Sequence, residues 1–182
     1  MQVTVKANYS KDWVRLLQNV KSMGGVKGVK VGIFDEATTE DGEYVAFYAA
    51  CNEFGTRDIP ARPFMRMTAE KHSQEWAKLF TQWTGEKLML EPSVAKRAFM
   101  AIGRKATSDM HDMILSNMPP PNAKEYAEWK RNKPATTKKG KDTTTGAAGG
   151  YTGTLVYSGK MLQSIWYRLV GENGQDIKVN RA

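Results

Sequence analysis

Few side chains in this 182-residue sequence have the types and spacing that catalysis or metal binding requires. His72 falls on the apolar stripe of an expected helix, where a packed, hydrogen-bonded histidine is favoured over a metal ligand. Asp109, His111 and Asp112 diverge around a helix, because neighbours one and two positions apart do not face each other. Cys51 has no second cysteine, so we interpret it as a small buried hydrophobe.

Motifs for phosphate, dinucleotide or thiol chemistry are missing from the sequence. It has no phosphate-binding P-loop, no glycine-rich dinucleotide fingerprint and no Cys-x-x-Cys pair. We therefore expect no catalytic residues, no metal and no cofactor, and interpret the protein as non-enzymatic. An enzyme whose site is built across subunits is the least favoured alternative.

The composition is that of one ordinary globular domain, with 41% hydrophobic and 25% charged residues. We expect a single domain over residues 1–182. Because no apolar run approaches the ~20 residues of a membrane span, we expect a soluble protein made in a reducing cytoplasm. The formal net charge of +8 favours an acidic partner, either nucleic acid or an acidic protein surface.

Hydrophobic periodicity predicts an α+β fold: a small antiparallel β-sheet with helices packed on one face, plus a long flexible loop insertion. Strands are expected at residues 2–7, 29–33, 165–170 and 177–180. Helices are expected at residues 11–22 with Ser10 as the cap, at residues 67–83, from Ser93 to before Pro119, at residues 122–132, and as one turn from Ser158 to residue 163.

Residues 44–54 fit two interpretations. Their aromatic side chains suit a strand, whereas apolar residues spaced three and four apart, with Gly55 placed as a C-cap, favour a short helix. We expect the helix.

A Thr/Lys/Gly-rich insertion occupies residues 132–153, and its composition is typical of a flexible segment. We expect it to become ordered only by folding against partners. A solvated segment and a nucleic-acid site are the competing interpretations of its charge. The candidate partner-binding residues in and beside it are Trp129, Lys130, Arg131, Lys133, Lys138, Lys139, Lys141 and Tyr151.

The most specific feature is a short motif before a proline-containing connector. Asn52-Glu53-Phe54-Gly55-Thr56 is followed by Ile59-Pro60-Ala61-Arg62-Pro63-Phe64-Met65-Arg66. The two prolines exclude a regular helix across residues 59–64 and stiffen an extended crossing.

Three expectations follow for the side chains of this motif. Gly55 supplies a left-handed or tight backbone. Phe64 enters the core beside Phe54. Glu53 and Arg62 flank the crossing, and form either a bidentate ion pair that locks it or two separately solvated surface charges.

This motif resembles that of the tail-completion and neck proteins of long-tailed bacteriophages, in which an EFGT turn precedes an IPARPF connector and a helix. The C-terminal part is similar more loosely. Residues 118–130 look like a proline-rich approach to a short helix, and residues 157–165 look like a DTG-x-L-x-x-SI segment with Ser158 in place of aspartate. The resemblance spans most of residues 29–170, but the insertion is longer than in that family.

The resemblance implies a structural virion protein without catalytic activity. Identical subunits would form a ring, a hexamer, that joins the tail tube to the head-side connector, with DNA passing through its lumen. The protein would be made in the host bacterial cytoplasm and end in the neck or tail of the virion. The motif residues that carry this expectation are Glu53, Phe54, Gly55, Thr56, Pro60, Arg62, Pro63 and Phe64.

A different function stays open from the charge pattern. A basic nucleic-acid-binding protein would use residues 130–141 to contact phosphates and Trp129 to stack on a base.

Overall fold

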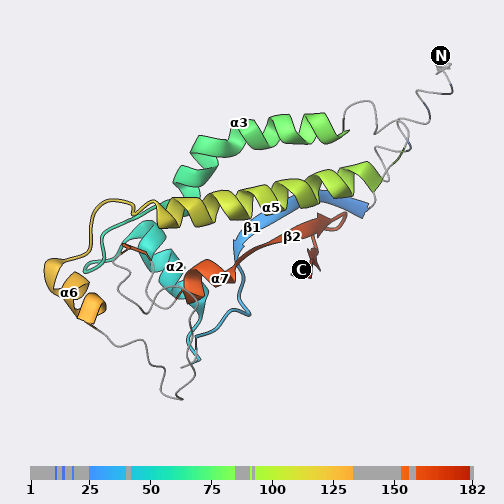
Figure 1. Ribbon diagram of the computed structural model, residues 1–182. Coiled ribbons are helices and arrows are strands. Elements are labelled where there is room, and N and C mark those ends of the chain that lie inside the picture. Colours follow the sequence, from blue (N-terminus) through green and yellow to red (C-terminus); the bar gives the residue numbers. More distant parts are fainter. Residues whose placement is uncertain are drawn as a thin grey trace, which may run out of the picture.

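The computed structural model describes residues 25–39, 42–84, 91, 93–132, 153–155 and 159–180, with residues 11, 14 and 18 as isolated positions. Its elements are β1 (Val26–Ile33), α2 (Val45–Phe54), α3 (Phe64–Thr84), α5 (Ser93–Leu115), α6 (Lys124–Asn132), α7 (Lys160–Ser164), β2 (Ile165–Gly171) and β3 (Asp176–Lys178). The helices and the small antiparallel sheet confirm the α+β class (Figure 1).

The sheet has the order β1-β2-β3, and both neighbouring pairs are antiparallel. Side chains alternate along β2, as a strand packed on one side requires. Ile165, Tyr167 and Leu169 are buried, whereas Trp166 and Arg168 are half-buried on the opposite face. The sheet therefore has an inward apolar face and an outward polar face.

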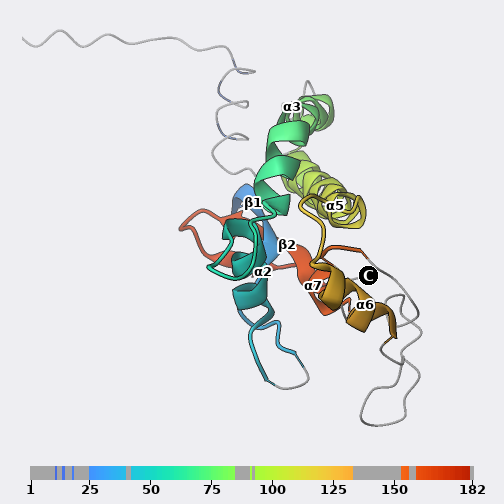
Figure 2. The same cartoon turned by 90° about the vertical axis from the view of Figure 1, so that its left-hand side faces the viewer.

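α5 covers the inward face of β1 and β2, and α3 runs antiparallel beside α5 (Figures 1 and 2). Gly103 lies where α5 crosses β2, and a Cβ atom there would stand 2.3 Å from the Tyr167 ring. The close approach of α5 to the sheet therefore depends on glycine at this crossing. The core cluster consists of Ala49, Phe64, Met110, Ile114, Met118, Leu155 and Ile165.

Most expected elements within the described residues are confirmed. α2 confirms the helical interpretation of residues 44–54, and α6 and β3 lie within two residues of their predicted bounds. The expected strand at residues 2–7, and most of the helix at 11–22 and of the insertion, lie outside the described residues. Among the helices that are described, none is long and apolar enough to cross a membrane.

Two helix starts differ from the prediction. α3 begins at Phe64, three residues early, because Pro63 precedes the first turn, where its missing N–H costs nothing, and its carbonyl oxygen accepts the Met67 N–H at 2.9 Å. The N-cap of α7 is Gly159, with φ 74° and no side-chain cap, whereas the expected cap Ser158 lies outside the described residues.

Candidate functional site: a braced connector and an exposed aromatic face

A buried carboxylate holds the connector between α2 and α3. The two carboxylate oxygens of Glu53 accept the backbone N–H groups of Met65 and Arg66 at 2.9 and 3.1 Å. Arg66 Nε donates to the same carboxylate at 3.1 Å, and its Nη2 donates to the Glu53 carbonyl oxygen at 3.1 Å. Glu53 therefore caps the N-terminus of α3, where unpaired N–H groups and the helix dipole favour negative charge.

Both interpretations of Glu53 and Arg62 are wrong, because the two side chains do not pair with each other and both residues are buried. Because α3 starts early, Arg66 falls in its first turn and takes the place beside the capping carboxylate. The Arg62 side chain is buried and reaches away from the connector to the loop before α6. Its donors bind Pro120 O at 2.8 Å, Pro121 O at 3.2 Å and Asn122 Oδ1 at 3.4 Å.

Gly55 and Thr56 shape the turn that leads into the connector. Gly55 has φ 77° and ψ 164°, and a Cβ atom there would lie 2.9 Å from the Ala61 backbone nitrogen. Both the backbone conformation and the space therefore require glycine. The Thr56 hydroxyl accepts the N–H groups of Asp58 and Ile59 at 3.3 and 3.0 Å. The connector is thus rigid although it belongs to no helix or strand.

The prediction that Phe54 packs beside Phe64 is wrong. Phe64 is fully buried, as expected, whereas Phe54 is 69% exposed, with the Arg66 guanidinium 5.3 Å from its ring centroid. Phe54 is the last residue of α2, and Gly55 turns the chain before that side chain could reach the core. In the connector, Pro60 is exposed and Pro63 is half-buried.

Phe54 belongs to a larger exposed surface in and beside α2. Tyr44 is 61% exposed, Phe47 is 68% and Tyr48 is 40%, and the rings of the last two meet edge to face at 6.1 Å. We call Tyr44, Phe47, Tyr48 and Phe54 the aromatic face. Apolar side chains of this size are normally buried, so a group of them in solvent indicates a binding surface.

α6 holds the described part of the predicted partner-binding residues. Tyr126 and Trp129 stack with ring centroids 5.6 Å apart, and both are about half exposed. Arg131 is exposed, but Lys130 is buried and donates to Gly153 O at 2.5 Å. The Lys130 ammonium therefore does not stand on the open surface, where the backbone phosphates of a nucleic acid would meet an exposed lysine. Lys133, Lys138, Lys139, Lys141 and Tyr151 lie outside the described residues.

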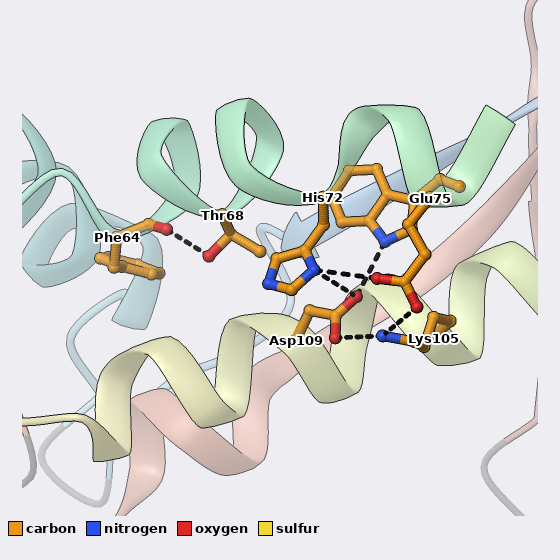
Figure 3. A network of polar contacts seen from close by, with 7 residues as sticks. Phe64, Thr68, His72, Glu75, Lys105 and Asp109 are labelled. Atoms are coloured by element: carbon orange, nitrogen blue, oxygen red, sulfur yellow. Dashed lines mark hydrogen bonds and ion pairs between the residues drawn. The ribbon is translucent and has the colours of Figure 1, made fainter. Parts of the chain in front are cut away.

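A polar network joins α3 to α5 (Figure 3). Asp109 is buried, accepting the Trp76 indole N–H at 2.8 Å and the Lys105 ammonium at 2.6 Å. The Glu75 carboxylate forms an ion pair with the Lys105 ammonium at 3.2 Å and a hydrogen bond with His72 Nδ1 at 3.1 Å. Burial would raise the pKa of Asp109, but the hydrogen bonds from Lys105 and Trp76 outweigh it and the pKa is lowered. The same bond to Asp109 raises the pKa of Lys105.

This network is a structural ion-pair cluster. His72, Glu75 and Asp109 each place one possible ligand atom within 4.8 Å of the others. The Lys105 ammonium already bridges the two carboxylates through Glu75 Oε1 and Asp109 Oδ1, however, so a cation is present between them without a metal ion. His72 is a half-buried, hydrogen-bonded side chain on the α5-facing side of α3, in line with its interpretation as a packed histidine.

The outward face of the sheet carries a second charged cluster. Arg168 and Lys178 both pair with Glu36, Lys178 at 2.8 Å, and Arg168 also lies over the Phe34 ring, 3.8 Å from its centroid. Hydrogen bonds from Lys178 and then Arg168 lower the pKa of Glu36 to about 2. These residues line a concavity of about 370 Å³ in which Glu36 already pairs with both cations.

Comparison of the chain with models of known protein families, with curated proteins and with solved structures finds no match.

Sequence reasoning found the motif but missed the residue that completes it. Arg66 was identifiable only as the residue after the connector, and its role depends on where α3 begins. The sequence did contain a signal for the aromatic face. Residues 45–52 include no charged side chain, and a ten-residue helix beside a small sheet cannot bury every side, so some of its apolar residues must be exposed.

Proposed function

We propose that this chain is a structural virion protein that forms a ring of identical subunits at the head–tail interface of a long-tailed bacteriophage. The motif that resembles one of tail-completion proteins forms a hydrogen-bonded brace around Glu53, and the Glu53 and Arg62 side chains are both engaged in structural hydrogen bonds. In the described residues, the titratable side chains between α3 and α5 bind one another, with Lys105 bridging the carboxylates of Glu75 and Asp109. These features support a scaffold that binds proteins rather than one that turns over a substrate.

The observation that carries the proposal is the aromatic face. It contains four large side chains exposed to solvent in and beside one short helix, and the only charged residue of α2, Glu53, is buried. Aromatic residues are enriched, and charged residues depleted, at the centres of protein interfaces. The brace fixes where α2 ends relative to α3, so this surface is presented in one orientation.

A second surface makes a ring the favoured assembly. The stacked Tyr126–Trp129 pair lies on α6, which projects from a different side of the same end of the molecule as α2 (Figure 2). A subunit that contacts its neighbours through two different surfaces assembles head to tail. Such an assembly closes into a ring when the rotation between neighbouring subunits divides a full turn into a whole number of copies. We propose that the aromatic face of one subunit contacts the α6 pair of the next.

Sedimentation velocity tests this assembly, with the chain alone and with purified tail tubes of the bacteriophage that encodes it. The test variant combines Phe47→Ser with Phe54→Ser, and the control is Trp83→Ser, an exposed aromatic on α3 outside both surfaces. Wild type and control should join the tubes as a discrete oligomer, while the double variant keeps its melting temperature but stays monomeric.

Two results would reject the proposal. One is a double variant that joins the tubes as well as wild type does, because the aromatic face would then be idle. The other is a wild-type chain that never associates with the tubes or with itself.

A further inference from the structure

Two buried cations lie together at the junction of the connector and α6. Arg62 is 4% exposed and Lys130 is 7% exposed. Arg62 donates only to carbonyl and amide oxygens in the loop before α6, and Lys130 donates to the Gly153 carbonyl oxygen. Within the described part of the chain, no carboxylate pairs with either group. Each charge therefore has neutral acceptors but no counter-ion among the described residues.

This arrangement is costly without an anion. A buried charge loses its hydration, and hydrogen bonds to neutral oxygens replace only part of it. The two cations also repel each other: burial first, and the positive charge of Arg62 second, lower the pKa of Lys130. Burial likewise lowers the pKa of Arg62. The rest of the described protein avoids this situation, since the other buried charges, Glu53 and Asp109, each have an oppositely charged partner.

A third donor converges on the same place. The Asn122 side-chain Oδ1 accepts a hydrogen bond from Arg62 Nη2 at 3.4 Å, while its Nδ2 is buried without any partner. Exchanging Oδ1 and Nδ2 of Asn122 would place an N–H donor against the Arg62 donor. The hydrogen bond from Arg62 therefore fixes the orientation of the side-chain amide. Asn122 thus brings a buried donor without a partner among the described residues to the amide that contacts the buried Arg62 guanidinium.

We propose that Arg62, Asn122 and Lys130 form an oxyanion-binding site. The guanidinium supplies a planar fork, the ammonium a point charge and the amide a neutral N–H, which together suit a carboxylate or a phosphate-like group. The oxyanion is either a carboxylate from another protein chain or a free inorganic ion, and both share this recognition chemistry. The site is independent of the ring proposed above.

Thermal unfolding in different sodium salts tests the site. The melting temperature is measured in phosphate and in acetate against chloride at equal ionic strength. At an ion concentration ten times the dissociation constant, an ion that binds only the folded state should raise the melting temperature by about 3–6 °C. This binding should saturate at the site. A response to both ions indicates a carboxylate-sized site, and a response to phosphate alone indicates a phosphate site.

Three variants separate this site from general salt effects. Lys130→Met should lose most of the response, whereas Arg131→Met, which removes an exposed charge on the same helix, should keep it. Asn122→Asp places a carboxylate beside the two cations, so it should raise the melting temperature in chloride and abolish the response.

An equal response in wild type, Lys130→Met and Arg131→Met, or no response to either ion, would overturn the proposal. Asn122→Asp decides the matter if Lys130→Met does not fold: a melting temperature below that of wild type in chloride would also overturn it.

Discussion

Glu53 joins two helices with one carboxylate. Its carboxylate accepts hydrogen bonds from two backbone N–H groups of α3 and from the Arg66 side chain, and Glu53 itself lies in the last turn of α2. A glutamine at this position keeps the shape but offers a single acceptor oxygen, and its –NH2 group would face a backbone N–H. The brace therefore depends on the charge as well as on the size of the side chain.

We expect Glu53→Gln to lower the free energy of unfolding by about 1–3 kcal/mol, because a buried, charge-assisted set of hydrogen bonds is replaced by an incomplete one. Urea unfolding measures this change. Glu70→Gln, which changes an exposed carboxylate on α3, is the control and should stay within about 0.5 kcal/mol of wild type. Equal urea midpoints for wild type, Glu53→Gln and Glu70→Gln would show that the Glu53 cap does not contribute to stability.

Gly55 tests the turn at the start of the connector. Alanine there meets an unfavourable backbone region and a Cβ contact of 2.9 Å with the Ala61 nitrogen. Gly174 also has a positive φ, of 79°, but nothing lies within 4 Å of its Cβ position. We expect Gly55→Ala to cost about 1–3 kcal/mol more than Gly174→Ala in urea unfolding, because only the first substitution adds a clash. An equal loss of unfolding free energy in both variants would mean that the connector shifts to accommodate the added Cβ atom, which would contradict this expectation.

Among the secondary-structure elements, the sheet carries the clearest pH dependence. The pKa of Glu36 is about 2 in the folded protein, against an ordinary value of 4.5. Between those values the unfolded chain binds more protons, so the contribution of Glu36 to stability is complete above pH 4.5 and is lost as pH falls towards 2.

We therefore expect Glu36→Gln to destabilise the protein at pH 7 and to unfold at nearly the same urea concentration as wild type near pH 2. Glu43→Gln, an exposed carboxylate outside this cluster, should show a smaller difference at pH 7. A Glu36→Gln deficit that persists unchanged at low pH would contradict the assigned pKa.

Much of the secondary structure was predictable because local patterns determine it. The three- and four-residue spacing of apolar side chains in α5 and the alternation in β2 each report a single buried face. The α2 helix was predictable for the same reason, with Gly55 marking its end. These signals lie within one element and do not depend on what that element packs against.

The contacts around the connector were not predictable, since they depend on tertiary placement. Proximity in sequence favours Arg62 as the partner of Glu53, but the position of α3 selects Arg66 instead. The burial of Lys130 follows from an acceptor at Gly153, 23 residues away. The exposure of Phe54 follows from where α2 stops. The periodicity of apolar residues within one element does not indicate which residues of other elements it will contact.

At the scale of the whole molecule, the two aromatic surfaces gather at one end. α2 and α6 lie near the C-terminal end of α5, while the antiparallel α3–α5 pair extends away from them (Figure 1). The aromatic side chains face solvent at this end, whereas Ala49 on the other side of α2 packs into the core. Substitutions on the aromatic face should therefore affect assembly and leave stability nearly unchanged.

Cryo-electron microscopy of purified particles of the encoding bacteriophage tests this account most directly. We predict a closed ring of copies of this chain between the tail tube and the head-side connector, with Phe47 and Phe54 of each copy covered by its neighbour. Particles that lack the chain in neck and tail, or rings in which those two side chains remain in solvent, would contradict it.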